Sequence, residues 1–171
     1  MKVIIGFSKA RSPYSILSKA IRLVEGTKFS HIYIRLPSLD IAEEVIYQAS
    51  GLKVNMECYK AFDHHAIIVE EYELEISDEA LRKTWKFALQ NAGISYGSKE
   101  LVGFIWVKLC ALFGKKVDNP FRDGRATYVC SELVAYILED CLDIETGDPE
   151  NMTPKEMNKI MKFIPGAVRT V

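Results

Sequence analysis

Apolar and polar residues follow two different periods along this chain. Over residues 71–76 apolar side chains alternate with glutamates, which is typical of a strand with one face in water. Short apolar runs at 3–7 and 32–36 predict buried strands, and the Ser50-Gly51 turn predicts a hairpin. The predicted strands are 3–7, 31–36, 43–50, 52–54, 65–69 and 71–76.

The remaining periodic stretches have helical spacing. Ser12 and Pro13 predict a helix start, and an apolar stripe from Ile16 to Val24 continues it until Gly26. Caps at Ser77 and Thr153 predict two more helices, with Leu81, Trp85, Ala88 and Leu89 facing the core in the first and Met157, Ile160, Met161 and Ile164 in the second. Strands and helices together predict an α+β fold.

A further helix is predicted from Ser98 to Phe113. Its stretch 101–113 is apolar nearly all round and is interrupted only by Lys108. Such a helix is either buried or offers an apolar surface to a partner, and burial is the simpler interpretation. The alternative is peripheral membrane contact through residues 101–113.

Length and composition limit the possible classes of protein. The 171 residues show no repeat or linker and predict one domain over 1–171. A net charge of −1 gives no electrostatic basis for binding nucleic acid. The apolar run after Met1 is too short for a signal peptide, and no stretch reaches the length of a membrane span, so we expect a cytoplasmic protein.

The four cysteines form neither a disulfide framework nor a CxxC pair. They predict free thiols in a reducing compartment. Cys58, Asp63, His64 and His65 lie near one another in sequence, but adjacent histidines on an extended chain point to opposite faces, so we predict no metal site.

Cys130 lies where a breaker-rich loop becomes an apolar helix with Leu133, Val134 and Ile137 on one stripe. Thr127 is the predicted N-cap. Unpaired N–H groups and the positive end of the helix dipole favour a thiolate in a first helical turn. The alternative is an inert core cysteine on that stripe.

A histidine 99 positions upstream supplies a possible base. His31 begins the predicted strand 31–36, with Tyr33 and Arg35 on its face of the strand. A nucleophilic cysteine needs a base to take its proton, and the two meet in space rather than in sequence.

The segment Ser30-His31 opening a strand, followed much later by residues 128–133 (Tyr-Val-Cys-Ser-Glu-Leu) on a helix, resembles the circularly permuted NlpC-type papain-like cysteine hydrolases, which include the lecithin:retinol acyltransferase-like proteins. In that group the histidine strand precedes the cysteine helix. The resemblance implies a permuted papain-like fold, with a small antiparallel sheet packed against the cysteine helix.

The resemblance also implies roles for single residues. Cys130 would be the nucleophile, His31 the base, and Gln48 the residue that orients the imidazole, with Glu43 and Glu44 as alternative orienting groups. Tyr96 and Tyr128 would lie on the substrate side, although packing is the favoured role of Tyr128. The Cys130 N–H would contribute to an oxyanion hole.

The implied reaction passes through a thioester acyl-enzyme and needs no cofactor. Amide cleavage in a peptide, isopeptide or cell-wall peptide is favoured. One alternative is hydrolysis or transfer of a lipid acyl group, which the apolar stretch 101–113 weakly favours. Another is a catalytically silent binding module, since a neutral Gln48 stabilises an imidazolium less than a carboxylate would.

Overall fold

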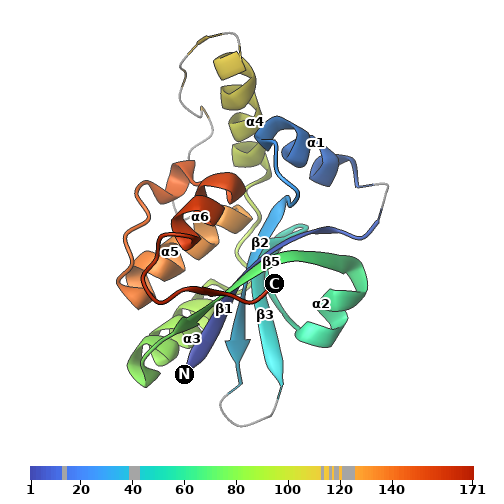
Figure 1. Ribbon diagram of the computed structural model, residues 1–171. Coiled ribbons are helices and arrows are strands. Elements are labelled where there is room, and N and C mark those ends of the chain that lie inside the picture. Colours follow the sequence, from blue (N-terminus) through green and yellow to red (C-terminus); the bar gives the residue numbers. More distant parts are fainter. Residues whose placement is uncertain (13–14, 39–42, 113, 116, 118–119, 121–125) are drawn as a thin grey trace.

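A six-stranded antiparallel sheet forms the centre of the computed structural model, which describes all residues except 13–14, 39–42, 113, 116, 118–119 and 121–125 (Figure 1). The strand order is β4-β3-β2-β1-β5-β6, and every neighbouring pair is antiparallel. The strands are β1 (Lys2–Ala10), β2 (His31–Pro37), β3 (Glu44–Ser50), β4 (Lys53–Cys58), β5 (Ala66–Glu75) and β6 (Val168–Arg169).

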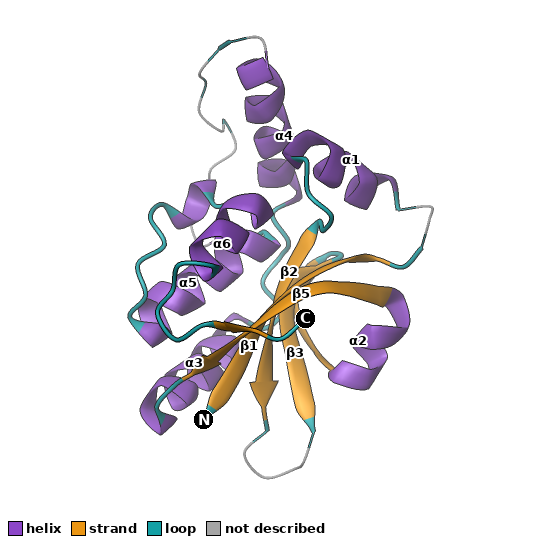
Figure 2. Cartoon of the chain, in the orientation of Figure 1, coloured by secondary structure: helices purple, strands orange, loops and turns teal. Residues whose placement is uncertain are grey.

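Helices lie on both faces of this sheet and at one of its ends. Figure 2 shows α3, α5 and α6 on one side, α2 on the other, and α1 beside α4 at the end. Their bounds are α1 (Ile16–Glu25), α2 (Tyr59–His65), α3 (Asp78–Asn91), α4 (Ser98–Leu112), α5 (Cys130–Leu142) and α6 (Pro154–Met161), with a short 3₁₀ helix, η2 (Pro149–Asn151). The α+β class predicted from the sequence is confirmed.

The main core lies between α5 and the sheet. Leu133, Val134 and Ile137 are completely buried, as their spacing predicts. They pack in one cluster with strand residues such as Ile32 and Ile34. Because β2 belongs to this core, the start of α5 is held against the start of β2.

The opposite face of β2 is also covered, which the sequence did not indicate. Tyr33 is completely buried and its hydroxyl donates to Glu71 at 2.7 Å. Its ring packs against Phe62 of α2. The ring crosses Gly6 on β1, where a Cβ would collide with it. Gly6 is therefore required by close packing.

Several predicted helix ends are confirmed and others are shifted. The hydroxyls of Ser77 and Thr153 accept backbone N–H groups, as expected of caps. The first helix begins at Ile16 and is capped by Ser15 rather than Ser12, whereas Pro13 lies outside the described residues. His65, predicted to open a strand, instead ends α2.

The predicted cap of the cysteine helix is wrong by two residues. Helix α5 begins at Cys130 with Val129 at the N-cap, and the Glu132 carboxylate accepts the Val129 N–H at 3.3 Å. A second misplaced residue is Leu89, which was assigned to the core but is 66 % exposed on α3.

Helix α4 matches the predicted apolar segment but is buried only in part. Gly103 and Cys110 are buried, whereas Val102 is 60 % and Trp106 is 55 % exposed. Phe113 lies outside the described residues. Within the described part of the chain, no helix has the length and apolar character needed to cross a bilayer.

Candidate active site

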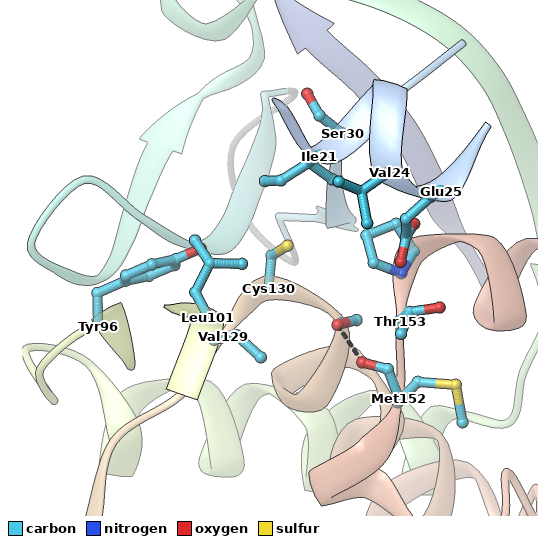
Figure 3. A pocket seen from close by; sticks show the side chains of 12 residues that line it. Ile21, Val24, Glu25, Ser30, Tyr96, Leu101, Val129, Cys130, Met152 and Thr153 are labelled. Atoms are coloured by element: carbon cyan, nitrogen blue, oxygen red, sulfur yellow. Dashed lines mark hydrogen bonds between the residues drawn. The ribbon is translucent and has the colours of Figure 1, made fainter. Parts of the chain in front are cut away.

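Cys130 is the first residue of α5, and its side chain lies beside the first residues of β2. Backbone N–H groups of Ile32, Ser131 and Cys130 itself act to lower the pKa of the thiol, because they stabilise a thiolate. The Ser131 hydroxyl donates to the Met152 carbonyl at 2.6 Å and fixes this first turn (Figure 3).

Burial outweighs the effect of these N–H groups. Cys130 is only 5 % exposed, and desolvation raises the pKa of its thiol from 9.0 to about 11. The negative charge of Glu25 on α1 also raises this pKa. The expectation that the helix start would make the thiol ionise more easily is therefore wrong for this closed arrangement.

His31 is tied to Gln48 on the neighbouring strand. Its Nε2 lies 2.6 Å from Oε1 of Gln48, and the Gln48 amide nitrogen donates to Oε1 of Glu57 on β4. The other oxygen of Glu57 lies 2.9 Å from Nε2 of His65. Four side chains thus form a continuous chain from His31 to the surface.

The carboxylate of Glu57 decides the direction of these bonds. A carboxylate only accepts, so Gln48 turns its NH₂ group towards Glu57 and its oxygen towards His31. The imidazole must then donate from Nε2, which leaves the lone pair on Nδ1 to accept a proton. In this tautomer the imidazole can act as a base through Nδ1.

The pKa of His31 is lowered from 6.5 to about 4, chiefly by burial. The hydrogen bond to Gln48 and the negative charge of Glu57 act in the opposite direction, and the charge of His65 lowers the pKa further. At neutral pH the resting site therefore holds a neutral imidazole and a neutral thiol.

Two adjoining cavities flank this pair. The one at Cys130 measures only about 30 Å³, room for about two water molecules, and is lined mostly by apolar side chains. Ile21, Val24 and Glu25 extend over it from α1 (Figure 3). The second, of about 370 Å³, includes His31, Gln48 and His65.

The two predicted tyrosines differ in position. Tyr96 lines both cavities, and the charge of a Cys130 thiolate contributes to raising its pKa, so it is close to the sulfur. Tyr128 is completely buried, lines neither cavity, and donates its hydroxyl to Asn91 at 3.2 Å. Its position agrees with the favoured packing role and not with the substrate side.

Glu57 is the residue that sequence analysis missed. The proposed alternatives are engaged elsewhere, with Glu44 3.4 Å from Arg35 and Glu43 3.6 Å from Lys60. The sequence linked Glu57 to the site only through the hairpin that it shares with Gln48. Whether the two side chains meet depends on the register of the two strands, which the sequence does not give.

No grouping of three or more His, Cys, Asp or Glu side chains suited to a metal ion occurs among the described residues. Cys58 and His65, two members of the group considered above, flank α2, and His65 contacts Glu57 instead.

Comparison with protein-family models gives no match, and comparison with curated proteins gives none. Among solved structures, the chain is similar to "metalloprotein yiiX from Escherichia coli O157:H7, DUF1105". The TM-score is 0.64 and the identity 17 %, over 99 % of this chain and 94 % of that chain. At this identity the likeness shows a common fold, and the word metalloprotein describes that protein.

Proposed function

We propose that this protein is a cysteine hydrolase that cleaves an amide bond through a thioester on Cys130. The observation that carries the proposal is the bond of 2.6 Å between His31 and Gln48, in the tautomer that leaves the lone pair of Nδ1 available to take a proton. A histidine whose role was only to fill space would not need two further polar groups to fix its orientation.

The reaction begins with proton transfer from the Cys130 thiol to Nδ1 of His31 as the sulfur attacks the carbonyl carbon. The carbonyl π electrons move to oxygen, and the N–H groups at the start of α5 stabilise the oxyanion. As the intermediate collapses, the C–N bond breaks and the imidazolium gives its proton to the departing amine. Water then attacks the thioester with His31 again as base, releasing the acid and the thiol.

Glu57 supplies the negative charge that the neutral Gln48 lacks. Its charge raises the pKa of His31 and so stabilises the imidazolium formed during the reaction. The pair itself starts neutral, so His31 acts as a general base during attack. A preformed thiolate–imidazolium pair is not part of this mechanism.

Trapping the acyl-enzyme tests the proposal. The native protein is mixed with p-nitrophenyl acetate, quenched in acid and digested. The mass of each cysteine-containing peptide is then measured by mass spectrometry. We expect a transient acetyl group on Cys130, no turnover in Cys130→Ala, and turnover at least about 100-fold lower in His31→Ala. Cys58→Ala, which removes an exposed thiol, is the matched control and should keep full turnover. Turnover that survives Cys130→Ala would refute the proposal.

A lipid acyl ester is the second candidate substrate. Ile21, Val24 and Leu101 give the Cys130 cavity an apolar lining that suits an acyl chain. An ester and an anilide of the same medium-length fatty acid separate the two candidates. Faster hydrolysis of short peptide anilides than of either acyl compound would favour the amide substrate.

A further inference from the structure

Helix α1 has its apolar side turned away from the protein. Ile16 is 81 % and Leu23 is 84 % exposed, while the two buried residues of the helix are Ser18 and Glu25. An amphipathic helix of a globular protein normally buries its apolar stripe. Of the predicted stripe, Ile16 and Leu17 are exposed, whereas Ala20, Ile21 and Val24 are partly buried, and Leu23 adds an exposed apolar side chain that was not predicted.

Polar contacts hold the inner side of α1 in place. The hydroxyls of Ser18 and Ser30 are 2.7 Å apart, and Oε2 of Glu25 accepts the Lys155 N–H at 3.2 Å. Nζ of Lys155 also donates to the Glu25 carbonyl at 2.8 Å. These contacts can be exchanged for water at little cost, unlike a packed apolar interface.

Helix α4, which packs against α1, also carries exposed apolar side chains. Figure 1 shows α1 and α4 side by side at the end of the molecule, away from α3. Val102 and Trp106 of α4 add exposed apolar area, and tryptophan is a residue typical of membrane–water interfaces. We call Ile16, Leu17, Leu23, Val102 and Trp106 the end surface.

The segment that contains α1 is cationic. Residues 9–28 carry five cationic side chains and one carboxylate, within a chain whose net charge is −1. That carboxylate is the buried Glu25, whereas Lys19 and Lys28 are exposed. Lys99, at the start of α4, is exposed as well. An apolar surface with a cationic border is complementary to a bilayer that contains anionic lipid.

We propose that α1 is a lid whose outer apolar side binds an anionic bilayer, and that this binding moves α1 off Cys130. The proposal deepens the proposed function, since it concerns access to the same thiol. The cavity at Cys130, of about 30 Å³, leaves little room for a substrate, so acylation should be slow until a covering element moves. Among the residues lining that cavity, Ile21, Val24 and Glu25 belong to α1.

Moving α1 would change the chemistry of the thiol as well as its access. Burial and Glu25 both raise the pKa of Cys130, and opening removes the charge of Glu25 together with the part of the burial that α1 provides. The N–H groups of Ile32, Ser131 and Cys130 would still favour the thiolate, while burial and the charge of Glu25 would disfavour it less. Bilayer binding should therefore accelerate modification of the thiol.

The experiment measures bilayer binding and thiol access together. The full chain is mixed with phosphatidylcholine vesicles, with or without phosphatidylglycerol, for co-sedimentation and for iodoacetamide labelling followed at the Cys130 peptide. We expect binding only with phosphatidylglycerol, weakening as salt rises, and labelling at least about tenfold faster on those vesicles than in buffer.

Two leucine variants make the test specific. Leu23→Asp removes an exposed apolar side chain from the end surface and should lower vesicle affinity about 30-fold, with loss of the accelerated labelling. Leu89→Asp makes the same change on α3, at another exposed helical leucine, and should leave both unchanged. Because both leucines are exposed, both variants should fold, and circular dichroism checks this.

Three results would overturn the proposal. The first is equal vesicle binding by the native chain and Leu23→Asp, and the second is vesicle binding that leaves Cys130 labelling unchanged. The third is a dimer, detected by sedimentation, that Leu23→Asp dissociates. The last would assign the end surface to a second copy of the chain. Acetylation of Cys130 by p-nitrophenyl acetate, measured separately, decides whether the proposed function stands. A protein that forms the acyl-enzyme but ignores vesicles would keep that function and lose the lid.

Discussion

The pH dependence of Cys130 alkylation follows directly from the closed site. Burial and Glu25 raise the pKa of the thiol from 9.0 to about 11, which corresponds to about 3 kcal/mol against the thiolate. Two pKa units reduce the thiolate fraction at pH 7 about 100-fold relative to a thiol of ordinary pKa. Without vesicles, labelling at Cys130 should therefore be slow and should rise about tenfold per pH unit up to about pH 10.

Iodoacetamide labelling of the native protein, followed by mass spectrometry of the Cys130 peptide between pH 6 and pH 10, measures this profile. Glu25→Gln is the informative perturbation, because it removes a charge that raises the thiol pKa but keeps an oxygen to accept the Lys155 N–H. It should speed labelling severalfold at every pH below the pKa. Glu73→Gln on β5 is the control, since Glu73 pairs with Lys2. A labelling rate that is already maximal at pH 6 and is lost in His31→Ala would refute the reasoning, because it would reveal a preformed thiolate–imidazolium pair.

Three further predictions concern the histidine and the sheet. Glu57→Gln should lower the pKa of His31 further and populate its second tautomer, which nitrogen NMR of the imidazole detects. The control Glu44→Gln should change neither the pKa nor the tautomer. Identical spectra for the native chain and Glu57→Gln would exclude Glu57 as the orienting charge. The His31 pKa of about 4 lies below its unfolded value of 6.5, so the unfolded chain binds the extra proton and stability falls as the pH drops from 6.5 to 4. Urea unfolding at pH 7 and pH 4.5 should show a loss larger by about 2 to 3 kcal/mol in the native chain than in His31→Gln, and equal losses would contradict the shift. Gly6→Ala should destabilise the fold by about 1 to 3 kcal/mol, measured by the same method, because its Cβ collides with Tyr33; an unchanged midpoint would show that the ring can move aside.

The sequence carried enough information to place the candidate cysteine and histidine in the fold but not to predict their surroundings. Cys130 and His31 lie at the starts of a helix and a strand, where short patterns of breakers and apolar residues give clear signals. Gln48 could be placed on the next strand for the same reason. Its bond to His31 needs only the pairing of two neighbouring strands, which a resemblance in order and spacing already implied.

Glu57 was missed because its role depends on strand register. The register pairs Ile46 with Glu57, so Glu57 lies diagonal to Gln48 on one face of the hairpin. A slip of one residue would have turned it to the other face. Sequence periodicity gives the faces of each strand separately and contains no information about this offset.

Tyr33 and α1 show a second limit of sequence analysis. Periodicity does not say which face of a strand or helix packs against the rest of the protein. Alternation along β2 marked Tyr33 as a polar-face residue, but α2 covers that face and buries it. The stripe on α1 was evident, yet periodicity defines an apolar side without saying what covers it. Only the tertiary arrangement shows that the polar Ser18 and Glu25 face inward.

The orientation of α1 contributes to the raised pKa of the Cys130 thiol. The helix excludes water from the sulfur and brings Glu25 near it, and both effects oppose the thiolate. A bilayer that draws Ile16 and Leu23 outward would weaken both at once. Because Glu25→Gln removes only the charge, it should raise labelling in buffer and reduce the further acceleration that vesicles give, while vesicle affinity stays the same. The two contributions to the thiol pKa, charge and burial, can thus be separated by adding one substitution to the vesicle experiment.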